Sequence, residues 1–199
     1  MKQYAASGIG PQRKIINTND KFGNSGIKNQ QGSTVIKYDT LPIDGRLEFR
    51  FFEGSAQRNF PFSNSGAQGN TLGVGNSLTV ERAYLTLLQY DDETGLWVDI
   101  DKLSLSAIPG LTLAEFGFTI ANSEVIKNVP ILSWFPEFNK YAENALNNNF
   151  DFDTQIVIPP LLEFVATLRC AAYARPTNNV YLRLTIEGTG AIIAPRTTF

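Results

Sequence analysis

The segment "VYLRLTIEG", residues 180–188, decides the fold because its side chains alternate strictly along the chain. A period of two is that of a β-strand with one buried face and one partly solvated face. The segment therefore predicts a half-buried antiparallel strand. The alternation sets Val180, Leu182, Leu184 and Ile186 against Tyr181, Arg183, Thr185 and Glu187.

The preceding segment, "FDFDTQIVIPPLLEFVATLRCAAYA" (150–174), extends this pattern upstream. A helix is an alternative there, but the period of two fits better. The polar turn "RPTNN" (175–179) separates the two segments, so we expect two long antiparallel strands near the C-terminus. One face of the upstream strand is expected to hold Phe164, Ala166, Leu168, Cys170 and Ala172.

Earlier segments also predict strands. "RLEFRFF" (46–52) places Leu47, Phe49 and Phe51 on one face. "LTVERAYLTLLQY" (78–90) predicts a long strand, which the turn "DDETG" joins as a hairpin to "LWVDIDKLSL" (96–105). "LTLAEFGFTI" (111–120) is a weaker strand candidate, because an Ala-Glu pair interrupts it.

One segment, "PEFNKYAENALNNN" (136–149), has helical spacing. Together these patterns predict a mainly β chain: an antiparallel β-sandwich with one short helix and an extended N-terminal arm. A jelly roll is the favoured form of sandwich. We expect two parts, an arm over residues 1–40 and a single sandwich domain over residues 41–199.

Composition excludes several classes of function. The chain has no histidine, so neither a Ser-His-Asp nor a Cys-His nucleophile can form, and the commonest zinc ligand is missing. The single cysteine, Cys170, excludes an intrachain disulfide. We predict no catalytic residue, cofactor or metal, and expect a non-enzyme. Neither a secretory apolar run nor an apolar stretch of about 20 residues is present, so no membrane span is expected.

Charge separates the arm from the rest of the chain. Residues 1–40 carry six basic and two acidic side chains, a net charge of +4, whereas the remaining residues carry −6. Any nucleic-acid contact is therefore expected to be local and to use this basic arm. The arm has too little apolar surface to fold alone. We expect other chains to order it, and the alternative is that it lies back over its own domain.

Seven apolar residues are candidate anchors at subunit interfaces. Five belong to the arm, and two belong to "SWFPEF" (133–138), where we expect an exposed apolar group if the helix end projects from the sandwich. The candidates are Ile9, Ile15, Ile16, Phe22, Ile27, Trp134 and Phe135.

Two other groups of residues leave alternatives open. The pairs Asp99/Asp101 and Asp151/Asp153 each place two carboxylates on one strand face, where they can bind Ca²⁺ or act as acid and base. The simpler interpretation is a solvated outer face. Aromatic side chains able to stack on sugar rings are Tyr84, Tyr90, Trp97 and Tyr181, although the abundance of Phe favours burial in a core or interface.

The segment "QIVIPPLLEFVATLRC", followed by a polar turn and "NNVYLRLTIEGTGAIIAPRTTF", resembles the last strands of β-sandwich structural proteins of bacteriophage virions. The Gly-, Asn- and Gln-rich basic arm is similar to arms that lace neighbouring capsid subunits together. The resemblance implies a capsid or capsid-associated protein, made in the host cytoplasm and located in the virion. Its partners would be copies of itself and other virion proteins. The alternative is a carbohydrate-binding or host-recognition module of a phage fibre or tail.

Overall fold

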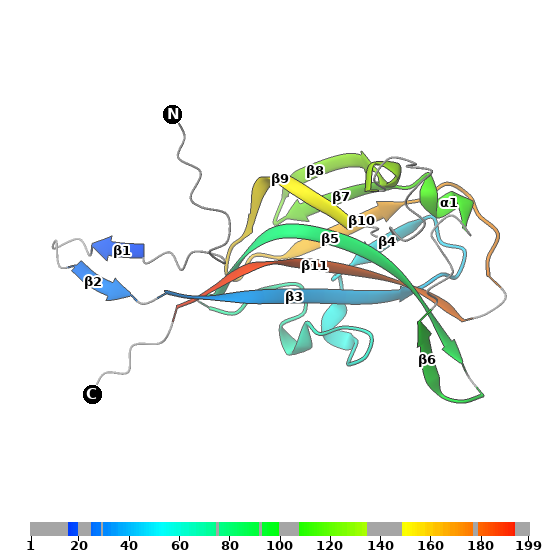
Figure 1. Ribbon diagram of the computed structural model, residues 1–199, viewed down its shortest axis with the longest axis horizontal. Helices are drawn as coiled ribbons and strands as arrows, with labels where there is room; N and C mark the ends of the chain where they lie inside the picture. Colours follow the sequence, from blue (N-terminus) through cyan, green and yellow to red (C-terminus); the bar gives the residue numbers. More distant parts are fainter. Residues whose placement is uncertain are drawn as a thin grey trace, which may run out of the picture.

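The chain folds mainly into β-strands, and most of them form two antiparallel sheets that enclose one hydrophobic core (Figure 1). This confirms the expected mainly β, antiparallel sandwich-like architecture. The computed structural model describes residues 16–19, 25–28, 30–74, 76–91, 93–99, 108–134, 149–176 and 179–193.

The larger sheet is built around two long strands, β11 (Val180–Ile193) and β5 (Asn76–Asp91). β3 (Gln30–Pro42) pairs with the other side of β11 and forms one edge. On the far side of β5, its first half pairs with β9 (Asn149–Ile158) and its last residues pair with β6 (Leu96–Asp99). The predicted hairpin between β5 and β6 is confirmed.

The smaller sheet has the order β4-β10-β7-β8. Its strands are β4 (Glu48–Phe51), β10 (Phe164–Arg169), β7 (Glu115–Ile120) and β8 (Ser123–Pro130). Across both sheets, the pairs β3/β11, β4/β10, β5/β9 and β7/β8 are nested in sequence, each inside the one before. Alternate pairs belong to opposite sheets, as if one long antiparallel ribbon had been rolled up.

Shorter elements complete the described part of the chain. β1 (Ile16–Asn19) and β2 (Ser25–Lys28) form a two-stranded sheet of their own, apart from both larger sheets in Figure 1. A one-turn helix, α1 (Pro109–Thr112), precedes β7. Three 3-10 turns follow other strands and loops, at Ser55–Gln57, Gly66–Gln68 and Ile131–Trp134.

The alternation that predicts β11 corresponds to its burial. All four residues expected on its inner face are buried, and Leu182, Leu184 and Ile186 are fully enclosed. In β10 the expected face is buried as far as Leu168, but the strand ends at Arg169 and Ala172 is exposed. The two strands lie in opposite sheets, so each contributes its inner face to the same core.

Three expectations differ from the structure. Leu47 is 53% exposed, because β4 begins one residue later and only Phe49 and Phe51 face the core. The segment 111–120 is a strand only from Glu115, because α1 takes its first two residues. Residues 30–40, which we assigned to the arm, lie within β3 and pair along their length with β11, so the sandwich begins at Gln30.

The helix expected over residues 136–149 lies outside the described residues, apart from Asn149, which begins β9.

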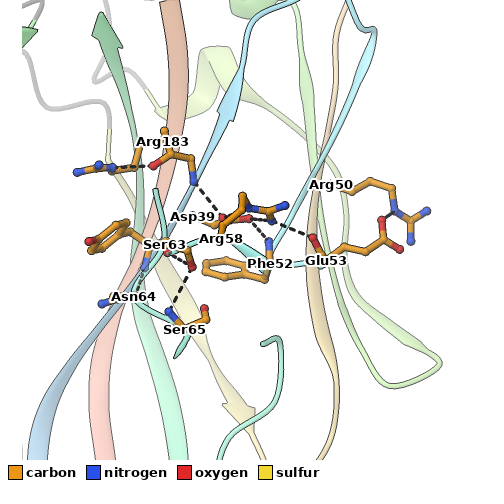
Figure 2. Close-up of polar contacts among 11 residues, drawn as sticks. Asp39, Arg50, Phe52, Glu53, Arg58, Ser63, Asn64, Ser65 and Arg183 are labelled. Atoms are coloured by element: carbon orange, nitrogen blue, oxygen red, sulfur yellow. Dashed lines mark hydrogen bonds and ion pairs between the residues drawn. The ribbon is translucent and has the colours of Figure 1, made fainter. Parts of the chain in front are cut away.

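A polar link joins the two sheets through Asp39, a fully buried residue of β3. Its carboxylate accepts hydrogen bonds from the backbone N–H of Phe52, directly after β4, at 2.6 Å, and from that of Thr40 at 3.1 Å. The Arg58 guanidinium donates two more, from Nε at 2.8 Å and from Nη2 at 2.5 Å (Figure 2). Every oxygen of this buried charge is therefore compensated, which offsets its cost of desolvation.

We predict that Asp39→Ala lowers the free energy of unfolding by about 3–5 kcal/mol, because it leaves Arg58 and the Phe52 N–H without their partner. The matched control is Asp44→Ala. Asp44 pairs with Arg46, which lowers the pKa of Asp44 to about 2, but both side chains are 37% exposed and water screens the pair. The control should therefore cost about 1 kcal/mol or less. Urea unfolding compares the two, and equal losses would contradict the structural role of Asp39.

Candidate functional site

The outer edge of β3 is the most distinctive surface in the described part of the chain. The loop that joins β4 to β5, which we call the covering loop, lies over only part of this edge. The side chain of Asn64 lies against the edge like a short strand, accepting from the Tyr38 N–H at 2.9 Å and donating to the Ile36 carbonyl at 2.7 Å. Ser63 Oγ donates to the Tyr38 carbonyl at 3.2 Å (Figure 2). These bonds satisfy the edge groups that another strand would otherwise pair with.

The same loop is fixed at two further places. Arg58, near its start, is held by Asp39 as described above. Arg183 of β11 donates to the Pro61 carbonyl at 2.8 Å and to the Thr40 hydroxyl at 2.9 Å, and its guanidinium stacks over the ring of Tyr38. The position of the covering loop is therefore set by contacts with both β3 and β11.

The N-terminal part of the edge has no such cover from the residues that the structure describes. The register with β11 is continuous along all of β3, so the groups that face outward recur at every second residue. Tyr38 and Ile36 face outward, and the same alternation turns the N–H and C=O of Thr34, Gly32 and Gln30 outward. Within the described residues, no hydrogen bond reaches these groups from outside the sheet. Thr34 and Ile36 are exposed.

The predicted interface anchors have different outcomes. Ile16 lies on β1 opposite Lys28, and Ile27 lies on β2 opposite Asn17, in the neighbouring pair of that hairpin. Ile9, Ile15, Phe22 and Phe135 lie outside the described residues. Trp134 is not an exposed anchor: it is 1% exposed and packs against Phe116 and Phe150, with ring centroids at 4.9 and 5.5 Å. Its own chain encloses it, because β7 and β9 bring these rings together.

Three of the four candidate sugar-stacking residues come together. Tyr90, Trp97 and Tyr181 form a cluster with Phe62, a residue of the covering loop that is not among the candidates predicted from the sequence. The ring centroids lie 5.0–5.7 Å apart and the planes are tilted by 58–79°. The rings therefore pack edge to face against one another, rather than as a flat row. Tyr84 is not part of the cluster.

A shallow depression of about 570 Å³ lies on the other sheet, over β4, β10, β7 and β8. The described residues that line it include five glutamates and two arginines but no aromatic side chain. Arg50 pairs with Glu53 at 2.7 Å and lies 3.9 Å from Glu48. The aromatic cluster and the depression thus belong to different sheets, so no aromatic row borders this groove.

No protein-family model, curated protein or solved structure matches this chain.

Of the four residues in the two carboxylate pairs, only Asp151 has a side chain that the structure describes. Asp151 lies on β9, where it accepts a hydrogen bond from Arg82 at 2.6 Å, and this contact raises the pKa of Arg82. Asp99 ends β6, and Asp101 lies outside the described residues. Within the described residues, no group of three or more acidic or cysteine side chains is placed to hold a metal ion.

Two further observations bear on chemistry. Burial raises the pKa of the Cys170 thiol to about 12, so the thiolate is scarce at neutral pH and the residue is a poor nucleophile. Among the described residues, no helix has the length and apolar character needed to cross a membrane.

We predict that Trp97→Ala lowers the free energy of unfolding by about 1–3 kcal/mol, because Trp97 contacts three other rings and holds the covering loop through Phe62. Tyr84→Ala is the control, since Tyr84 has no aromatic contact among the described residues. The control should cost less in the same thermal or urea unfolding experiment. A loss for Trp97 no larger than that for Tyr84 would show that the ring cluster is not a packing feature.

Proposed function

We propose that the protein is a structural subunit of a bacteriophage particle, a capsid or capsid-associated protein that self-assembles. In this proposal the N-terminal segment interlaces neighbouring copies, and the protein catalyses no reaction. Its partners are copies of itself and other virion proteins, and its location is the virion. The proposal rests on the resemblance of its C-terminal strands and arm to virion proteins, together with one structural observation.

That observation is the separation of the β1–β2 hairpin from the two large sheets. The β1–β2 hairpin pairs with neither large sheet, and among the residues whose burial is described the buried hydrophobic core begins at Leu41. Residues 1–29 carry five basic side chains and one acidic one, a net charge of +4, whereas residues 30–199 carry −6. A segment of this length can reach on the order of 100 Å when extended. It is therefore long enough to cross a neighbouring subunit, and opposite charge favours that contact.

The strand order supports the jelly-roll form of the sandwich. Rolling up a ribbon of four antiparallel pairs places alternate pairs in opposite sheets, which is the arrangement of β3/β11, β4/β10, β5/β9 and β7/β8. Jelly rolls occur in viral capsid proteins and in lectins. Because one fold serves several functions, this likeness favours the proposal without deciding between a capsid subunit and a carbohydrate-binding module.

The second candidate is a carbohydrate-binding or host-recognition module of a fibre or tail. The gathering of Tyr90, Trp97 and Tyr181 favours it. Stacking on a sugar requires an open ring face, however, and these rings are half-buried and pack edge to face against each other and Phe62. We therefore place this function second.

Deletion of residues 2–29 tests the proposal. The truncated chain should remain soluble and folded, because it retains both sheets and the core, but it should no longer form the higher-order assembly of the full-length protein. Light scattering coupled to size exclusion measures the mass, and circular dichroism measures the fold.

The matched control is the full-length chain with residues 2–29 in shuffled order, which keeps the charge but changes the spacing of Ile9, Ile15, Ile16, Phe22 and Ile27. It should assemble poorly and remain sensitive to salt, because electrostatic attraction alone is screened at high ionic strength. If the truncated chain assembled to the same mass and yield as the full-length protein, the proposed role of the N-terminal segment would be wrong.

A further inference from the structure

The part of the β3 edge that no described residue covers is uncharged, and its outward-facing backbone groups are spaced evenly about one residue. It runs from Gln30 to Thr34, and its outward-facing backbone groups belong to Gln30, Gly32 and Thr34, so Gly32 is its centre. Residues 29–36 contain no charged residue and no proline. Natural proteins usually protect an exposed edge with lysine, proline, a bulge or a covering segment. Here the loop through Asn64 protects the edge from Ile36 onward only.

We propose that residues 30–34 pair antiparallel with the same residues of a second copy of the chain, with Gly32 on the twofold axis. This inference rests on the proposed self-association and names one surface at which two copies meet. Gln30 of each copy then lies opposite Thr34 of the other, and the pairing supplies about six backbone hydrogen bonds. The two large sheets become one continuous sheet across the pair.

Three features favour a second copy as the partner. Because the open segment is symmetric about its centre, one register satisfies the outward-facing groups of both copies, as a twofold interface requires. The absence of charge over residues 29–36 means that no like charges oppose each other across the axis. Glycine at the centre places no side chain on the axis.

The covering loop determines the register in which two copies of β3 can pair. A pairing centred on Ser33 would set Gln30 of one copy opposite Ile36 of the other, but the Ile36 carbonyl already accepts from Asn64 and the loop occupies that position. A register centred on Gly32 avoids the loop altogether. Because the contact is short, we expect it to be weak alone and to gain strength when N-terminal segments bind the same copies.

Disulfide trapping tests this register. In the full-length Cys170→Ser background, which removes the native thiol, Gly32→Cys should form a disulfide-linked dimer on mild oxidation. Directly opposed residues in such a pair have Cα atoms about 5.5 Å apart, within the range of a disulfide. Gln31→Cys and Ser33→Cys are matched controls. Each would lie about 8 Å from its own counterpart, too far to link, but opposite the other.

The predicted pattern is a dimer from Gly32→Cys, little from either control alone, and a dimer again when the two controls are mixed in equal amounts. The mixture keeps the test decisive if Gly32→Cys fails to fold, as judged by circular dichroism. Assembly measured by light scattering without this pattern would overturn the edge pairing and leave the proposed function standing. A chain that stays monomeric at all concentrations would overturn both.

Discussion

The buried carboxylate of Asp39 is the interaction on which the arrangement of β3, the covering loop and the two sheets depends. Burying the Asp39 carboxylate without hydrogen-bond partners would cost free energy of folding. The contacts with the Phe52 N–H and the Arg58 guanidinium offset that cost and therefore fix the positions of both groups. The hydrogen bond from the Phe52 N–H to Asp39 holds the end of β4 against the larger sheet. The hydrogen bonds from Arg58 to Asp39 hold the start of the covering loop at β3. The Ser63 and Asn64 contacts then cover that edge from Ile36 onward.

This constraint divides β3 into two parts with different properties. From Ile36 to Thr40 the strand is held by contacts with the covering loop and with Arg183. From Gln30 to Thr34 no hydrogen bond from the described residues covers the edge, and this part of β3 directly follows the basic N-terminal segment in the sequence. The proposed assembly surfaces, the basic N-terminal segment and the open edge, are thus adjacent in sequence. A self-contained sandwich with both at one end of its first strand suits a subunit that binds copies of itself.

The sequence predicts the strands whose pattern is local. The spacing of residues predicts β11 and the long β5, because each of these strands has one face in the core. The turn residues between β5 and β6 predict the hairpin of these two strands. β3 is different: "QQGSTVIKYDTLP" shows no clear alternation, and it is a strand because β11 pairs with it along its whole length. Asp39 gave no signal of burial either, since its partners Phe52 and Arg58 are distant in sequence. Trp134 was predicted to be exposed for the same reason, because the rings that enclose it come from β7 and β9.

The central claim is that this chain associates with itself into a larger assembly. The mass of the full-length protein in solution tests that claim most directly, measured by sedimentation velocity over a range of protein and salt concentrations. Our account predicts species many times heavier than the 22.0 kDa chain, which dissociate in part as salt screens the basic N-terminal segment from the acidic sandwich. A single species of 22.0 kDa under all of these conditions would contradict it.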